Sequence, residues 1–532
     1  MSRCILSILV ALSTLVALLP APASSQDRTA AERLGKVSFP VSCSAAAQQQ
    51  FDRAVAQLHS FWFQAATQAF AGVAQTDPSC AMAHWGTAMT LLGNPLAAPP
   101  APKALAEGWA AVERAMNIGA KTPREADYIA AIGAFYKDSD RVDHRPRALA
   151  YEKAMERLAA TYPTDREATI FYALSLNVTL VPTDKTYAHQ LKAAALLEKV
   201  FAEQPEHPGV AHYLIHSYDF PPIAVRGLPA ARLYAGIAPS APHAQHMPSH
   251  IFTRVGAWQE SIDSNRAAAA LARADGERDG ALHAMDYMMY GYLQTAQDRE
   301  AKRLLDEVPG VTGVSMTPIA GFFGRAAIPA RYALERRAWG LAASLEPQPN
   351  PRFPFTEAIT HFARALGAAR GGDAAAAQKD VDRLEALRDA LMQAKSGYWA
   401  EQVEVQSRAA AAWVALAQGR RDDALKLIRT AADLEDSTEK HPVTPGPLAP
   451  ARELLGEMLL EVKDAPGALR EFEASMKKEP NRFTGTYGAA RAAEIAGDRD
   501  KARAYYARLL AIAERADTER PELRQAKAYL GR

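Results

Sequence analysis

Apolar side chains recur every three or four residues over most of the chain, from about residue 46 to residue 530. This spacing places them on one face of an α-helix. Proline-rich breaks interrupt the pattern at Asn94–Pro102, Glu346–Pro354 and His441–Pro450. Alanine is abundant and Val, Ile and Thr are sparse, which also favours helices over strands. The sequence therefore predicts an all-α protein.

A repeated unit is clearest near the C-terminus. Ala468 and Ala502 are 34 residues apart, and so are Phe472 and Tyr506. Small residues let two helices of a hairpin approach closely, and an aromatic fills the space between hairpins. The period of 34 is that of the tetratricopeptide (TPR) repeat. We predict a right-handed, TPR-like α-solenoid of stacked helix hairpins.

The beginning of the chain has the three parts of a signal peptide. Arg3 is followed by the almost wholly apolar stretch Ile5–Leu19 and by the small residues Ala21-Pro22-Ala23. We expect residues 1–25 to be a signal peptide, 26–310 an N-terminal solenoid and 311–532 a C-terminal solenoid. The alternative is that this segment is retained as an N-terminal anchor. No later stretch reaches 18 apolar residues, so no further membrane span is expected. The mature protein is expected to be periplasmic or secreted, without an integral membrane segment.

The charge balance bears on the kind of partner, and the cysteine content bears on the compartment. Removing Arg3 from the 61 basic residues leaves 60, which balance the 60 acidic residues. A neutral chain gives no sign of nucleic-acid binding. Only Cys43 and Cys80 follow the signal segment, and an oxidising compartment permits a disulfide between them. Two separate buried thiols are the alternative.

Histidines gather in one part of the chain. Six of the 13 fall between His212 and His283. Pro208, His212 and His216 are spaced four residues apart, and the same pattern returns 34 residues later at Pro242, His246 and His250. Residues four apart share a helix face, and residues one repeat apart occupy equivalent positions on neighbouring helices. We therefore expect these histidines to converge on one patch of a concave groove.

Imidazoles in this arrangement are suited to a transition metal such as zinc, copper or iron. The expected metal ligands are His212, His216, His246, His250 and Asp219. The wider ligand-binding site adds two residues of the next helix, His283 and Asp286. A carboxylate there can instead orient a ligand ring.

Two other interpretations of the histidines stay open at the level of sequence. They can form a polar groove that binds a peptide without a metal, or they can be packing residues. Pro248 distorts the second motif and can turn His246 away from His250. No HExxH, GxSxG, phosphate-binding glycine loop or dinucleotide fingerprint is present. The loop 435–450, with four prolines, either covers the groove as a lid or bridges two hairpins.

Several strings are specific enough to suggest a relationship. Asp77–Gly86, His246–Phe252 and the 435–450 loop resemble a largely uncharacterised family of exported bacterial TPR proteins. The resemblance implies the fold and export, and it carries over no catalytic residue. On function, we expect a binding or scaffold protein that holds a peptide, a protein partner or a small ligand in its groove, with or without a bound metal. The alternative is a metal-dependent enzyme with a His/Asp site in the same groove.

Overall fold

The computed structural model describes residues 32–97, 99–314 and 319–531. The chain divides into two compact units, Met1–Arg33 and Leu34–Arg532. The expected signal peptide, residues 1–25, lies outside the described residues, and every described helix belongs to the second unit. Among these residues, no helix is both long and apolar enough to cross a membrane.

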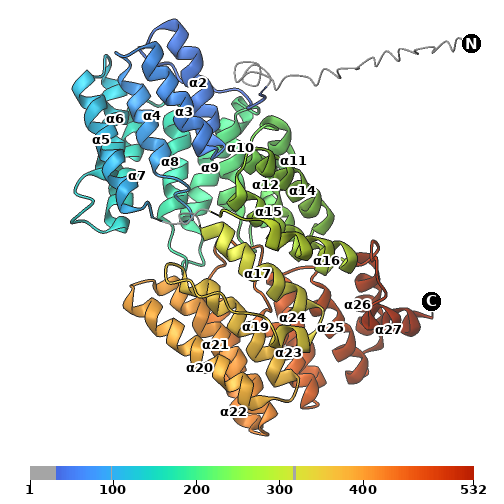
Figure 1. Ribbon diagram of the computed structural model, residues 1–532. Helices are drawn as coiled ribbons and strands as arrows, with labels where there is room; N and C mark the ends of the chain where they lie inside the picture. The colour runs from blue at the N-terminus through green and yellow to red at the C-terminus, as the bar shows by residue number, and fades with distance from the viewer. Residues whose placement is uncertain (1–31, 98, 315–318, 532) are drawn as a thin grey trace, which may run out of the picture. The chain divides into compact units, whose positions relative to one another are not determined.

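All regular structure in the described ranges is helical, and neighbouring helices pack as hairpins (Figure 1). The prediction of an all-α, TPR-like solenoid is confirmed. In the N-terminal half the helices are α2 (Ala45–His59), α3 (Phe63–Thr76), α4 (Ala81–Leu91), α5 (Pro102–Ile118), α6 (Pro123–Tyr136), α7 (His144–Thr161), α8 (Arg166–Thr179), α9 (Ala188–Glu203), α10 (Pro208–Tyr218), η1 (Ala224–Gly227), α11 (Leu228–Ile237), α12 (Pro242–His246) and α13 (Pro248–Val255). They continue as α14 (Trp258–Ala274), α15 (Arg278–Gln294), α16 (Asp298–Glu307), η2 (Val308–Gly310), α17 (Ile319–Glu335), α18 (Trp339–Ala343), α19 (Pro354–Arg370), α20 (Ala374–Gln393), α21 (Gly397–Ala417), α22 (Arg421–Ser437), α23 (Ala451–Glu461), α24 (Ala465–Lys478), α25 (Phe483–Ala496), α26 (Arg499–Ile512) and α27 (Pro521–Leu530).

The repeat residues pack as their spacing predicts. Ala468, Phe472, Ala502 and Tyr506 are all fully buried. A side chain at Gly488 would place its Cβ only 2.3 Å from the ring of Phe472. Glycine is therefore required there, because the aromatic ring of one helix rests directly on the backbone of the next.

Three prolines start the helices that carry five of the six clustered histidines. Pro208, Pro242 and Pro248 open α10, α12 and α13, where the missing N–H of proline costs no hydrogen bond. The sequence predicts one helix over 242–255, but the structure divides it at Met247. Proline lacks the N–H that a continuous helix needs, and its ring clashes with the preceding turn.

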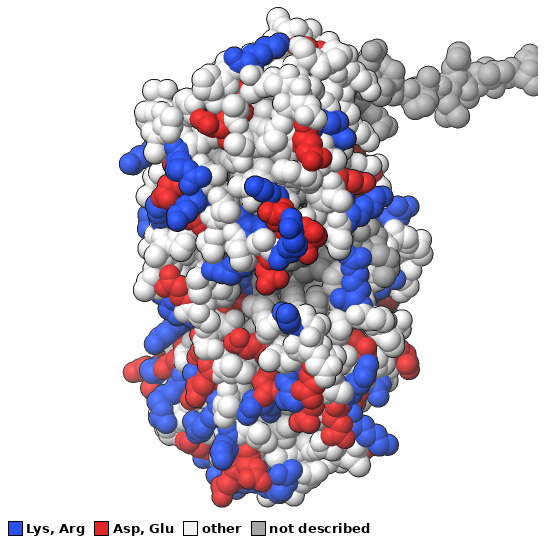
Figure 2. Space-filling view, turned by 90° about the vertical axis from the view of Figure 1, so that its left-hand side faces the viewer, with Lys and Arg blue, Asp and Glu red and all other residues white. Residues whose placement is uncertain are grey.

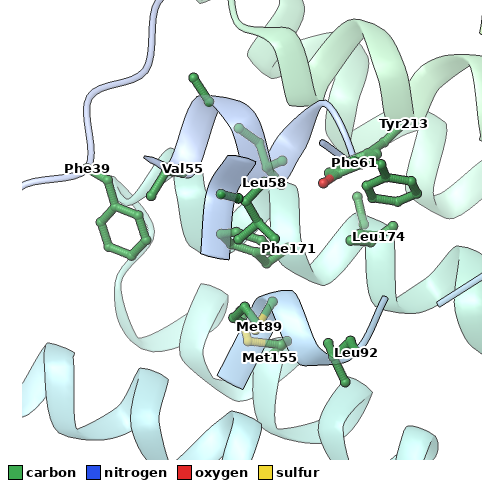
Figure 3. Packing of buried hydrophobic residues seen from close by; sticks show 14 of the residues in the cluster. Phe39, Val55, Leu58, Phe61, Met89, Leu92, Met155, Phe171, Leu174 and Tyr213 are labelled. Atoms are coloured by element: carbon green, nitrogen blue, oxygen red, sulfur yellow. The ribbon is translucent and has the colours of Figure 1, made fainter. Parts of the chain in front are cut away.

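A disulfide joins Cys43 to Cys80, with a Cα–Cα distance of 5.1 Å. It ties the segment before α2 to the start of α4. Behind it, Phe39, Val55 and Leu58 belong to the apolar core that continues to Phe171 and Tyr213 (Figure 3). This core fixes α2 against α8 and α10, next to the first histidines.

The division at residue 310 stays a prediction. Helix α15, before this boundary, packs against helix α17, after it. Basic and acidic residues are interspersed over the face seen in Figure 2, without a large area of one sign.

Candidate metal centre

The six clustered histidines come from four helices. His212 and His216 lie on α10, His243 and His246 on α12, His250 on α13 and His283 on α15. The pairs on α10 and on α12–α13 are buried, with at most 7% of any of the four residues exposed. The sequence predicts this convergence, but the patch is enclosed between helices and does not line an open surface.

Their ring nitrogens form two neighbouring groups of three. His212, His216 and His243 make the first group, and His246, His250 and His283 make the second. In each group, one nitrogen from every ring lies within 4.8 Å of the other two. Either group therefore has the spacing that lets three imidazoles bind one ion.

In the second group, hydrogen bonds to Nδ1 determine which ring nitrogen of His246 and of His250 carries the proton. His246 Nδ1 lies 2.6 Å from Asn265 Oδ1, and the amide of Asn265 is oriented by its own donation to Ser261 O at 2.8 Å. Asn265 thus presents an acceptor, and His246 Nδ1 carries the proton. A neutral His246 must then have a bare lone pair at Nε2.

His250 is held in the same tautomer by a carboxylate. Its Nδ1 donates to Asp219 Oδ2 at 2.8 Å, which leaves Nε2 without a proton in the neutral ring. The Nε2 atoms of His246 and His250 nevertheless lie only 3.0 Å apart. Two lone pairs face each other at hydrogen-bond distance with no proton between them.

Asp219 is itself held by two cations. Arg254 Nε donates to Oδ1 at 2.8 Å, and Lys440 Nζ donates to Oδ2 at 3.2 Å. Burial alone would raise the pKa of Asp219, but Lys440 and Arg254 hold it well below its usual range. The carboxylate is therefore ionised and acts as an acceptor for His250. Asp219, expected among the metal ligands, here orients a ligand ring.

The two facing lone pairs of His246 and His250 are not separated by an added proton, because both rings favour the neutral form. Burial lowers the pKa of both rings. Neighbouring histidines and Lys440 lower the pKa of His246 further. At His250, burial together with Lys440 and Arg254 outweighs the raising effect of Asp219, so its pKa is also lowered. Burial likewise lowers the pKa of the other four imidazoles, His212, His216, His243 and His283. Neutral imidazole is the form that binds a metal.

The first group repeats the arrangement on α10. His212 Nδ1 donates to the backbone oxygen of His59 at 2.6 Å, so its Nε2 is also bare. This oxygen is available because His59 ends α2, where the last carbonyls have no helical partner. His212 Nε2 and His216 Nε2 lie 3.1 Å apart. Among the described residues, none holds His216 as Asp219 holds His250, so His216 Nε2 can carry a proton and donate it to His212 Nε2.

The loop 435–450 covers the second group. Tyr287 OH lies 3.3 Å from His250 Nε2 and within 3.2 Å of the backbone oxygens of Pro442 and Thr444. The hydroxyl has one proton for three acceptors, so the site contains more lone pairs than protons. Lys440, from the same loop, reaches Asp219. The loop thus covers the site, one of the two roles that the sequence allows.

The structure corrects the assignment of Asp286. Its carboxylate accepts from Arg331 Nε at 2.7 Å, and both side chains are fully buried. Arg331 in turn donates to Gly446 O and Pro447 O, so the pair holds the loop in place. Asp286 follows His283 by three residues on α15, but its partner is a guanidinium, not the histidine cluster.

A third cluster of titratable groups has no counterpart in the sequence prediction. Glu167 Oε2 accepts from His59 Nε2 at 2.8 Å, and Glu167 Oε1 accepts from His207 Nε2 at 2.9 Å. Tyr213 OH lies 3.0 Å from His59 Nδ1. These residues come from α2, α8 and the N-terminal part of α10 at irregular spacing, so no sequence signal joins them.

A pocket lies beside the covered histidines. It encloses about 1080 Å³ of empty space, including solvent at its mouth, and both Arg254 and Lys440 line it. Its wall includes Trp399, Gln402 and Gln406 of α21. Gln402 Nε2 and Gln406 Oε1 are buried and have no hydrogen-bond partner among the described residues.

Comparison with known proteins gives distant structural likeness only. No protein-family model and no curated protein matches the sequence. The crystal structure of the APC/C hetero-tetramer Cut9–Hcn1 is 11% identical over 91% of this chain and 95% of that chain, with a TM-score of 0.28. The human IFIT1 dimer with m7Gppp-AAAA is 11% identical over 81% of this chain and 90% of that chain, with a TM-score of 0.32. The fold assignment rests on the helix packing of this chain.

Proposed function

We propose that this protein binds a transition-metal ion among His246, His250 and His283. The observation that carries the proposal is the 3.0 Å approach of two Nε2 atoms whose protons are both committed to the opposite nitrogen, Nδ1. Lone pairs at this distance repel unless a positive charge lies between them. A metal ion supplies that charge without protonating a buried ring.

The distance agrees with shared coordination. With metal–nitrogen bonds of about 2.0–2.1 Å, two ligands at a tetrahedral angle are about 3.3 Å apart, and two at a right angle are about 2.9 Å apart. The observed 3.0 Å lies within this range. The third ligand is His283, whose ring centroid is 4.3 Å from that of His246 and whose buried Nδ1 has no described partner.

The donor set favours zinc, copper or iron, which imidazole ligands suit. We propose that the loop 435–450 covers the ion and that the protein is a metal-containing binding protein of an oxidising, extracytoplasmic compartment. The Cys43–Cys80 disulfide supports that compartment. A metal-dependent enzyme would in addition need a coordination position that substrate can reach. In this structure Tyr287 and the loop carbonyls cover that side of His250.

Elemental analysis of untagged protein, purified without chelator, tests the proposal. We expect at least one equivalent of zinc, copper or iron, lost in His246→Ala/His250→Ala. The matched control is His84→Ala/His189→Ala, which removes two partly buried histidines outside the cluster and should keep the metal. Circular dichroism and the milder His246→Gln/His250→Gln pair separate metal loss from unfolding. A metal-free protein that takes up none of the three metals would contradict the proposal.

A second candidate function is ligand binding in the neighbouring pocket. Gln402 and Gln406 lie one turn apart on α21 and leave one donor and one acceptor unpaired among the described residues. One residue of an extended peptide presents its C=O and N–H on the same side and can pair with both. Calorimetric titration with a panel of capped tetrapeptides should detect binding that Gln402→Leu/Gln406→Leu abolishes. Equal heats from wild type and variant would exclude this pocket.

A further inference from the structure

The structure contains a second set of three histidines directly beside the proposed metal site. We infer that His212, His216 and His243 bind a second transition-metal ion, so that the solenoid holds a two-ion centre. This inference rests on the proposed function, because it extends the same chemistry from one group of histidines to its neighbour.

The first argument is the duplication of the geometry. Each group contains a pair of histidines four residues apart, and the pairs are separated by the 34-residue repeat. In each pair the first ring donates through Nδ1, to His59 O at 2.6 Å or to Asn265 Oδ1 at 2.6 Å. In each pair the two Nε2 atoms then lie 3.1 or 3.0 Å apart.

The second argument is the third ring of each group, which comes from the following part of the solenoid. His243 supplies it to the first group and His283 to the second. Each of these rings has a buried nitrogen, Nε2 in His243 and Nδ1 in His283, that has no hydrogen-bond partner in the described part of the chain. An unpaired buried ring nitrogen costs free energy that a metal bond would offset.

The third argument is the surroundings of the first group. His212 lies under Phe61, with ring centroids 4.5 Å apart, and His243 stacks on the same phenylalanine at 5.4 Å. Apart from the backbone oxygen of His59 and the bare Nε2 of His212, which lies 3.1 Å from His216 Nε2, no acceptor contacts the ring nitrogens of these three histidines among the described residues. An apolar wall around neutral imidazoles strengthens metal–ligand electrostatics.

The two groups are close enough to act together. His216 and His250 have ring centroids 6.0 Å apart, and His243 and His246 are 5.9 Å apart. We expect the second ion to bind more weakly than the first, by about 10–100-fold, because no carboxylate in the described ranges orients the ring of His216.

The test uses the full-length protein, stripped with chelator, loaded with Cu²⁺ and freed of excess metal by gel filtration. We expect two equivalents in wild type, one in His216→Ala/His243→Ala and one in His250→Ala/His283→Ala. The control His84→Ala/His189→Ala should keep two. Electron paramagnetic resonance adds a readout of distance, since two adjacent Cu²⁺ ions couple and the wild-type signal per ion should fall below that of either variant.

The outcomes separate the two proposals. One equivalent in wild type, unchanged in His216→Ala/His243→Ala, would overturn the second site and leave the first intact. Two equivalents with uncoupled signals would overturn the two-ion centre, because the second ion would lie elsewhere. No bound copper in any protein, with zinc and iron also absent, would overturn both.

Discussion

Two buried histidine clusters in this molecule have similar distances between their ligand atoms but differ in where the ring protons lie. Around Glu167, each carboxylate oxygen receives an N–H from one imidazole, at 2.8 Å from His59 and 2.9 Å from His207. Around His246 and His250, two lone pairs meet at 3.0 Å. Both clusters have ligand atoms close enough to hold an ion.

The difference shows that hydrogen-bond complementarity separates a structural cluster from a metal site better than a count of histidines. At Glu167 donors face an acceptor, so no cation is needed between them, and only His207 Nδ1 is left without a partner among the described residues. Gly209 supports this arrangement, since a Cβ there would lie 2.5 Å from His59 Nδ1. At His246 and His250 acceptors face each other, and this contrast is the basis of our metal proposal.

The largest expected effect comes from breaking the cluster of His59, Glu167 and His207. We call it the matched cluster, because its donors face an acceptor. Glu167→Gln removes one of the two acceptors and leaves a buried histidine donor unpaired. The free energy of unfolding, measured with urea, should fall by about 3–5 kcal/mol, the usual cost of breaking a buried ion pair. The control Glu156→Gln alters an exposed pair with Lys192 and should cost about 1 kcal/mol or less. Metal content should not change, and a metal-free Glu167→Gln protein would contradict the separation of the two clusters.

The cluster of His246, His250 and His283, in which acceptors face each other, should instead lose thermal stability when a chelator is added. We call it the mismatched cluster. Removing a metal present at about 100 times its Kd lowers stability by about 3 kcal/mol. EDTA should therefore lower the Tm of wild type and of Glu167→Gln more than that of His246→Ala/His250→Ala, in which only the weaker second ion can bind. A Tm that chelator leaves unchanged in wild type would argue against a resident ion.

The matched cluster should also dominate acid sensitivity. Burial alone would raise the pKa of Glu167, but His207 and His59 lower it to about 2, below the ordinary 4.5. The unfolded chain then binds the proton more readily, so this stability, about 3 kcal/mol, is present above pH 4.5 and is lost as the pH falls toward 2. Wild type and Glu167→Gln should therefore converge in stability over this interval. A difference that is constant with pH would show that Glu167 is not ionised in the folded protein.

The smallest expected effect concerns the carboxylate that orients His250. Asp219→Asn should raise the Kd for the metal by about 10–100-fold, because it weakens the support of a ligand ring. Competition with a chromophoric chelator measures the change. Asp298→Asn, which alters a buried pair with Arg520, is the control and should leave the Kd unchanged. Equal affinities for Asp219→Asn and wild type would mean that Asp219 does not act through His250.

Spacing along the chain predicts most of the helices and the meeting of the histidines, although not the division of 242–255 into α12 and α13. The 34-residue step places His212 and His246, and likewise His216 and His250, at equivalent positions, and the turn of a helix brings each pair together. The buried Phe472 and Tyr506 follow from the same periodicity.

The protons of the site could not be predicted in this way. They depend on partners far along the chain, such as His59 O for His212 and Asp219 for His250, 153 and 31 residues away. Asp286 was assigned to the site because it follows His283 on α15, but Arg331, 45 residues further on, binds it instead. Spacing along the chain predicts which residues share a helix face. Which ring nitrogen carries the proton depends on tertiary contacts, which the spacing does not show.

The most direct measurement is X-ray diffraction from crystals of the untagged protein, with data collected above and below the absorption edges of zinc, copper and iron. We expect an anomalous peak within about 2.0–2.1 Å of both His246 Nε2 and His250 Nε2. No anomalous peak between these atoms, with an ordered water donating to both nitrogens in its place, would contradict the central claim.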